Sequence, residues 1–268
     1  MTALAAPPVL RSSTLGQIGL LAGRSVLHAV RTPAQMIFPI VFPLVLLGVN
    51  TSGLDAATKL PGFPTASYLD FALAVPFMQG ALFTALNGGQ DLARDIENGF
   101  LDRLAMTPMS GAALLAGQLG GALFTGTVSA ILYLLVGLTF GAGISAGVGG
   151  AAMLVVLAVT ICMAFACFGT FVALRAGSGQ AVQGFFPLFF VLLFLSSAFF
   201  PRELIEQEWF RTVATYNPVS YMVEGVRSLV ITGWDTTALL RAFGISGIAI
   251  VAFLAASSRA LKTRLLRT

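Results

Sequence analysis

Charge is the scarcest property of this sequence: only 10% of its 268 residues are charged, whereas 57% are hydrophobic and the mean hydropathy is +0.89. A soluble domain of this length has too little interior to hide so many apolar side chains. The composition therefore argues against a soluble protein and predicts an all-α integral membrane protein. The net charge of +4 does not indicate nucleic-acid binding, because the basic residues are dispersed at the ends of apolar runs.

Residues that support catalysis or metal binding are also few. The chain has one histidine, His28, which excludes most metal clusters and histidine triads, and two cysteines, Cys162 and Cys167. The cysteines lie about 140° apart on a helix, so we expect packing residues and no disulfide. The sequence contains no GxxxxGK(S/T) phosphate loop, no HExxH and no GxSxG. We therefore expect no catalytic residue, no ATPase site, no metal and no cofactor in this chain.

Long apolar runs predict six transmembrane helices, since a bilayer needs ~20 apolar residues per helix. The first run contains Pro39 and Pro43, so we expect a kinked helix that neighbouring helices support. The chain then divides into an N-terminus with an interfacial helix (1–32), a transmembrane domain (33–258) and a basic tail (259–268). The predicted spans are residues 34–49, 68–86, 111–140, 148–174, 181–200 and 239–256.

Residues 13–31 have an amphipathic pattern. Arg24, His28 and Arg31 lie within about 60° of one another on a helix, and Leu15 and Ile18 lie on the opposite side. The pattern predicts a helix in the cytoplasmic interface of the membrane, with its apolar face in lipid and its basic face toward the headgroups. His28 is then one more polar residue on the wet side of that helix.

The distribution of basic residues predicts the orientation of the chain. With the N-terminus inside, the inner side carries Arg11, Arg24, Arg31, Arg94, Arg103, Arg175, Arg259, Lys262, Arg264 and Arg267, and the outer side carries Lys59, Arg202, Arg211, Arg227 and Arg241. Basic residues are enriched on the cytoplasmic side of membrane proteins. Both termini and residues 91–110 are therefore expected in the cytoplasm.

The segment 91–108 is a polar island between two apolar runs. On a helix, Asp91, Asp95, Asn98 and Asp102 form one stripe, and Leu92, Ile96 and Phe100 form another. We expect one or two short amphipathic helices, broken near Gly99 and ended by Thr107-Pro108. Such an element either binds a water-soluble partner or is a solvated connector whose charges keep it out of lipid.

The outer segment 201–238 is too structured for a simple loop. A break at Asn217-Pro218 separates two amphipathic stretches, neither long enough to cross a membrane. We expect two short helices that enter the outer leaflet or cover its surface. Glu224 and Arg227, three residues apart, are expected to form either an ion pair that eases shallow burial or a loose surface pair.

The predicted spans carry no charged residue near their middle. This argues against an ion-coupled secondary transporter or channel, although broken helices also bind ions through carbonyl groups. That class and a non-transporting assembly or sensor subunit remain the alternatives to a transport subunit driven by a separate ATPase.

Three segments resemble type-2 ABC exporter permeases, in particular the daunorubicin-resistance subgroup. They are residues 97–104 followed by Thr107-Pro108-Met109-Ser110, residues 194–201, and residues 217–227. The first has the family's order of an acidic residue, a glycine two positions on, a leucine two further and a Thr/Ser-Pro. The last is similar to the family's outer Asn-Pro-(Leu/Val)-(Ser/Thr)-Tyr element with an arginine six residues after the tyrosine. The chain departs from the family at residues 204–209, where a Leu-Pro is common, and at Phe100, where a threonine is common.

The resemblance implies a permease subunit of the bacterial cytoplasmic membrane that dimerises with a second, identical or homologous permease and pairs with two ABC ATPase subunits, which carry the ATP and Mg. It implies alternating-access export of a hydrophobic or amphipathic drug, natural product or lipid, with a role in antibiotic resistance.

The resemblance also implies roles for particular residues. Residues 91–108 then form a coupling helix, and the interfacial helix with Arg24, His28 and Arg31 is a second contact with the ATPase. The implied coupling residues are Arg94, Glu97, Gly99, Phe100, Leu101, Arg103, Leu104 and Pro108. The implied outer-helix residues are Asn217, Pro218, Tyr221, Glu224 and Arg227.

Overall fold

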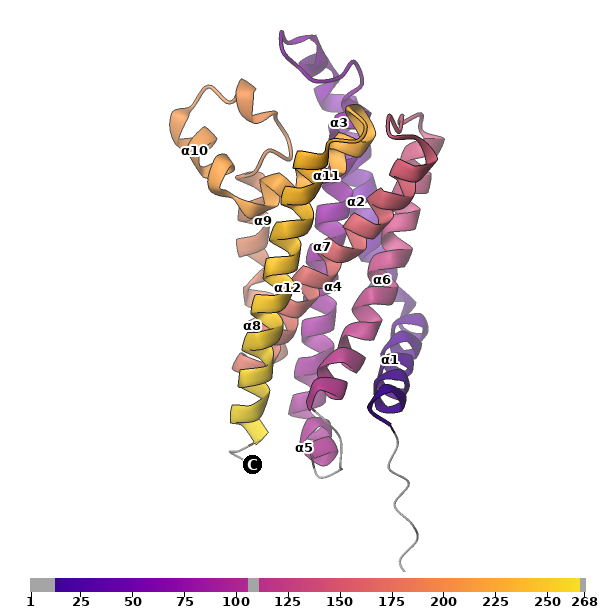
Figure 1. Ribbon diagram of the computed structural model, residues 1–268, viewed down its shortest axis with the longest axis vertical. Helices are drawn as coiled ribbons and strands as arrows, with labels where there is room; N and C mark the ends of the chain where they lie inside the picture. Colours follow the sequence, from indigo (N-terminus) through magenta and orange to yellow (C-terminus); the bar gives the residue numbers. More distant parts are fainter. Residues whose placement is uncertain (1–12, 106–110, 266–268) are drawn as a thin grey trace, which may run out of the picture.

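The computed structural model describes residues 13–105 and 111–265, and every regular element in this part of the chain is a helix (Figure 1). Five segments are long and apolar enough to cross a membrane. Their main helices are α2 (Pro33–Leu54), α4 (Ala74–Glu97), α6 (Gly111–Thr139), α7 (Gly147–Ala176) and α12 (Thr236–Leu265). These five correspond to five of the six predicted spans and make the chain a multi-pass membrane protein.

The bounds of three spans differ from the prediction. Helix α2 continues five residues past the predicted end at 49, to Leu54. The second is preceded by a short helix, α3 (Tyr68–Ala72), and α4 continues eleven residues past the predicted end at 86, to Glu97. The sixth continues as α12 through Leu265, so most of the predicted tail 259–268 is helical. Polar residues extend α4 and α12 because a helix needs apolar residues only at the depth of the lipid tails.

The predicted fifth span, 181–200, is wrong as a single helix. The chain forms α8 (Gly179–Gly184) and α9 (Phe186–Phe194), which are separated at Phe185 and together are shorter than a full span. Pro187 lies two residues after the break, at the second position of α9, where its missing amide proton removes the helical bond to the carbonyl of Gln183. Beyond this come the 3₁₀ turn η2 (Arg202–Leu204), α10 (Glu208–Tyr216) and α11 (Pro218–Ile231).

Helix α4 lies at the centre of the bundle. In the most apolar stretch of the span that α3 and α4 form, 83% of the residues are buried, against 17% in the spans of α2 and of α12. A glycine permits its close contact with α7: a Cβ on Gly169 would lie 2.2 Å from the carbonyl oxygen of Ala85. Elements at both ends of the bundle are therefore positioned relative to α4.

Two prolines inside α2 leave carbonyl groups that its own backbone cannot pair, because a proline at i cannot donate to the carbonyl at i−4. Pro39 frees the carbonyl of Gln35, which accepts a hydrogen bond from Asn87 Nδ2 on α4 at 3.1 Å. Pro43 frees the carbonyl of Pro39, which accepts one from the Tyr133 hydroxyl on α6 at 2.7 Å. The prediction that neighbouring helices support α2 is confirmed.

Helix α1 (Thr14–Arg31) runs beside the first turns of α6 (Figure 1). A Cβ on Gly117 would lie 2.3 Å from Leu21 Cβ, and one on Gly120 would lie 2.5 Å from Ala22 Cβ. These contacts pack α1 against α6, a contact that the predicted interfacial helix does not include. Leu15 and Leu20 remain exposed, as a helix face in contact with lipid requires.

Candidate functional site

The α5 end of the bundle is where α1, the end of α4 and the short helix α5 (Phe100–Ala105) meet (Figure 1). Helix α4 ends at Glu97, and Gly99 follows with a φ of +64°, in the left-handed region. Glycine adopts this conformation at little cost and commonly ends helices in this way. The predicted break near Gly99 is confirmed. Asp91 and Asp95, however, belong to the last turns of α4 and not to a separate surface helix.

Arg24 on α1 connects α4 and α5. Its two terminal nitrogens pair with the two carboxylate oxygens of Asp95 at 2.9 and 2.7 Å. Its guanidinium also lies 4.1 Å from the centre of the Phe100 ring. The hydrogen bond to Asp95 raises the pKa of Arg24 above its ordinary value. A planar guanidinium suits both contacts, the fork to a carboxylate and the stack on a ring.

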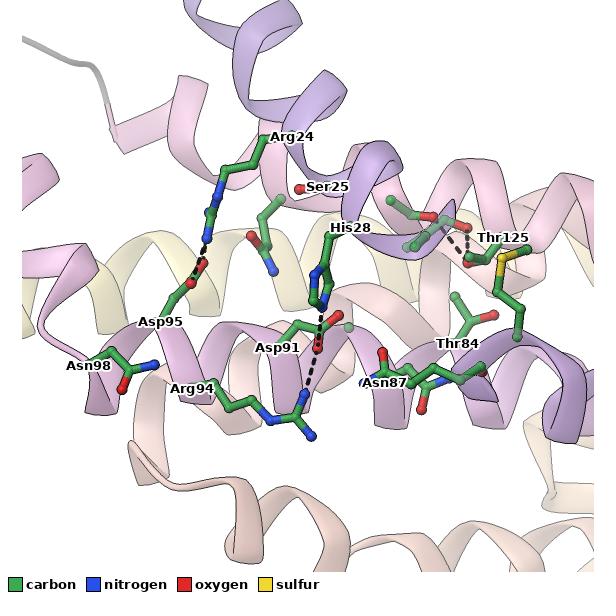
Figure 2. Close-up of a pocket in the computed structure, with 17 residues that line it drawn as sticks. Arg24, Ser25, His28, Thr84, Asn87, Asp91, Arg94, Asp95, Asn98 and Thr125 are labelled. Carbon is green, nitrogen blue, oxygen red and sulfur yellow. Dashed lines mark hydrogen bonds and ion pairs between the residues drawn. The ribbon is translucent and has the colours of Figure 1, made fainter. Parts of the chain in front are cut away.

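Asp91 forms a second cluster one turn before Asp95 (Figure 2). Its Oδ1 lies 3.5 Å from His28 Nε2 and 3.3 Å from Arg94 Nη1. Arg24 and His28 therefore point toward the acidic stripe of α4, which corrects the expectation that they face lipid headgroups. Arg31 is exposed.

A cavity of about 220 Å³ lies between α1, α2, α4 and α6, and these two clusters line it (Figure 2). Most of the other lining side chains carry amides or hydroxyls, among them Ser25, Gln35, Thr84, Asn87, Asn98, Gln118 and Thr125. Such a lining accommodates water or a hydrogen-bonding group. Among the residues that the structure describes, no group of three His, Cys, Asp or Glu side chains is arranged to hold a metal ion.

Helix α5 is attached to the bundle through Leu101, which is 1% exposed. Leu101 belongs to a buried cluster with Leu92 and Ile96 of α4, Leu114 of α6 and Leu261 of α12. This corrects the expectation that Leu101 contacts a partner, because its side chain is already covered.

The remaining predicted coupling residues differ in exposure. Phe100 is half-buried beneath Arg24, whereas Arg94 and Arg103 are exposed. Arg103 donates to the carbonyl of Asn98 at 3.4 Å. The side chain of Leu104, and Pro108 with its preceding threonine, lie outside the described residues.

The opposite, α11 end brings together two of the resembling segments. The Asn217 side chain caps α11 by accepting from Val219 N at 2.9 Å and donates to the carbonyls of Leu192 and Leu195 at 2.6 and 3.2 Å. Pro218 occupies the first helical position, where no amide proton is needed. The Tyr221 hydroxyl donates to the carbonyl of Thr215 at 2.8 Å. These bonds join α9, α10 and α11.

Arg227 is buried and binds backbone instead of Glu224. Its guanidinium donates to the carbonyls of Phe71, Ser197 and Ala198 at 3.2, 2.9 and 2.9 Å and lies 3.5 Å from the centre of the Phe71 ring. Glu224 pairs with Arg202 and accepts from the Ser197 hydroxyl. The predicted Glu224–Arg227 ion pair is wrong, because both side chains find partners outside α11.

Comparison with known proteins adds two findings. The family model described as ABC-2 type transporter matches residues 16–231, from α1 through α11. The chain is also similar to the daunorubicin resistance ABC transporter permease protein DrrB1 of Streptomyces coeruleorubidus. The two are 27% identical over 203 residues, which cover 74% of this chain and 69% of that protein.

Proposed function

Because this chain belongs to the ABC-2 type transporter family, we propose that it is the permease subunit of an ATP-driven exporter whose separate ATPase docks on α5. One observation carries the docking site: α5 is a short helix beyond the end of α4, and its Leu101 is buried in a cluster to which α4, α6, α7, α8 and α12 all contribute side chains. A small helix fixed in this way transmits a push to the bundle, whereas a loose connector absorbs it. This favours the coupling element over the solvated connector.

The exposed charges of Arg94 and Arg103 are the contacts that this chain offers to the ATPase. The part of the Phe100 ring that Arg24 leaves uncovered adds an apolar contact. Two ATPase subunits bind the ATP and Mg and close on each other, and the resulting movement of α5 changes the access of the permease from one side of the membrane to the other. Arg24 links α1 to the same movement, because it pairs with α4 and stacks on α5.

A second permease copy, or a homologous permease, completes the transport path. Helix α2 leaves a row of apolar side chains exposed, among them Ile37, Val41 and Val45. Membrane lipid and the second copy share such a surface. The cargo passes between the two copies and is hydrophobic or amphipathic, such as a drug, a natural product or a lipid, because the spans are apolar and carry few charges.

The described chain begins and ends at the α5 end (Figure 1). The excess of basic residues assigns this end to the cytoplasmic side. We place the protein in the bacterial cytoplasmic membrane, with both termini in the cytoplasm.

The test reconstitutes the tagged chain in liposomes with and without the ABC ATPase subunit that co-purifies with it. We expect ATP hydrolysis by the complex, and ATP-dependent movement of daunorubicin, the probe suggested by the name of the relative. An ATPase variant that cannot hydrolyse ATP is the control and abolishes movement. Ion-gradient-driven flux from the permease alone would identify a secondary transporter instead. Partners that assemble with the chain but move no cargo would identify a sensor or assembly subunit.

A further inference from the structure

Glu97, the last residue of α4, contacts the start of α8, where the connection between α7 and α8 lies at the α5 end of the bundle. Its Oε1 accepts a hydrogen bond from the backbone amide of Gly179 at 3.1 Å. Gly179 is the first residue of α8, and the amides of a helix's first turn have no partner within the helix. The neighbouring Ser178 hydroxyl accepts from Ala181 N at 3.3 Å, so Glu97 and Ser178 together cap α8.

A second contact between α4 and α8 lies two turns deeper. A Cβ on Gly89 would lie 2.8 Å from Cγ1 of Val182, so α4 and α8 pack closely here. Val182 is buried in the same cluster as Leu92, Ile96 and Leu101. The cluster that attaches α5 to α4 therefore also attaches α8.

Helix α8 begins the broken fifth segment, and this segment leads to the opposite end of the bundle. Helix α9 follows at Phe186 and ends near the carbonyls of Leu192 and Leu195, which Asn217 binds. The segment α8–α9 is therefore attached to α4 at its start and to Asn217 at its end, with a break at Phe185 in between. A displacement of α8 acts on this whole segment.

We infer that Glu97 is a positioning residue that carries the movement of α4 and α5 to α8, and that it acts on the Gly179 amide within this chain instead of on the ATPase. This inference rests on the proposed function, because it concerns how an ATPase-driven movement spreads. Glu97 is then no longer a contact with the ATPase subunit, and it instead joins the end of α4 to the start of α8 within the permease.

The chain offers a variant on each side of the bond. Glu97→Ala removes the acceptor. Glu97→Gln keeps an acceptor oxygen and removes only the charge. Gly179→Pro removes the donor and keeps the Glu97 residue, although the proline Cδ takes the place of the amide hydrogen and the carboxylate must turn away. Proline suits the first position of a helix, the extended backbone of Ser178 suits a residue before proline, and a Cβ at Gly179 meets no atom within 4 Å.

The experiment measures daunorubicin moved per ATP hydrolysed by the reconstituted complex, together with the amount of ATPase that co-purifies. Glu97→Ala and Gly179→Pro should each lower the transport ratio by about three- to tenfold, the range for one hydrogen bond. The double variant should be no worse than either single variant, since all three lack the same bond. Glu97→Gln should stay within about twofold of wild type. Co-purification should remain unchanged in all of them, and Gln180→Ala, an exposed neighbour on α8, should behave as wild type.

Two results of this transport experiment would overturn the inference. One is loss of the ATPase from both Glu97 variants with Gly179→Pro unaffected, which would make the carboxylate a contact between subunits. The other is strict additivity of the two single effects. Absence of any ATPase from the wild-type preparation would instead refute the proposed function, and this inference with it.

Hydrogen exchange provides a readout that needs neither ATPase nor cargo. In the purified permease, Glu97→Ala should accelerate exchange of the Gly179 amide about three- to tenfold, because that amide loses its acceptor. Unchanged exchange there would show that the bond does not hold the start of α8, and would overturn the inference even if transport fell.

Discussion

At the α5 end, charged side chains from α1 and α4 meet around a partly open cavity, whereas at the α11 end one buried guanidinium binds three backbone carbonyls. The Arg24 side chain is 47% exposed, and Arg227 as a residue is only 7% exposed. Ion pairs in contact with water contribute little to stability and exchange partners easily. A buried group bonded to backbone is costly to remove. The comparison indicates an adaptable end that can respond to a partner and a fixed end that resists change.

Arg227→Ala should have the largest effect on stability. It leaves three buried carbonyl groups without a donor, so the free energy of unfolding should fall by roughly 3 to 5 kcal/mol. Thermal unfolding of the purified protein in detergent measures this. Arg211→Ala, at an exposed position on α10, is the control and should unfold with wild-type behaviour. If Arg227→Ala lowers the free energy of unfolding only slightly, the α11 end is not more resistant to change than the α5 end.

Asn217→Ala should cost less, about 1 to 2 kcal/mol, because it loses the cap of α11 and the bonds to α9. Asn217→Asp sharpens the result, since the carboxylate still caps Val219 N but cannot donate to Leu192 and Leu195. If Asp restores full stability, the cap matters and the connection to α9 does not. The same unfolding assay distinguishes these outcomes.

Tyr133→Phe extends the comparison to the middle of the bundle. Losing the hydroxyl leaves the Pro39 carbonyl unpaired, so stability should fall by about 1 kcal/mol. The matched control is Tyr216→Phe on the exposed face of α10, which should be neutral. Equal effects of the two variants would mean that the freed carbonyl of α2 finds another donor.

Arg24→Ala should have the smallest effect on stability, below about 1 kcal/mol, and added salt should reduce it further. Arg24→Lys should not restore the loss fully, because lysine cannot form the two-point contact with Asp95 while stacking on Phe100. Unfolding measured at low and high salt tests both statements. An effect as large as that of Arg227→Ala would contradict the proposed difference between the ends.

The sequence predicted elements better than partners. Apolar runs located five spans, and Gly99 correctly marked the end of a helix. Spacing within one helix also suggested that Glu224 pairs with Arg227, but it shows only which residues share a face. Arg202, 22 residues away, takes Glu224 instead. Long-range pairs of this kind depend on how helices pack, which no local pattern contains.

Prolines in the sequence indicate two features of the structure. Pro187 interrupts the apolar run 181–200, and the break between α8 and α9 at Phe185 lies two residues before it. Pro39 and Pro43 each free one carbonyl group of α2, which needs a donor from a neighbouring helix. That these donors are Asn87 and Tyr133 follows only from the packing of α4 and α6. The spacing predicts the stripe of Asp91 and Asp95, but it does not predict that Arg24 and His28 on α1 are its partners.

The two prolines of α2 also impose an order on biosynthesis. The helix is translated before the donors that complete its hydrogen bonding, and Tyr133 lies 94 residues after Pro39. At ribosomal speeds of about 5 to 20 residues per second, the nascent chain waits roughly 5 to 20 seconds before that donor is made. During this interval, water, lipid headgroups or the insertion machinery must solvate the open carbonyls. Helix α2 thus completes its hydrogen bonding only after α6 has been made.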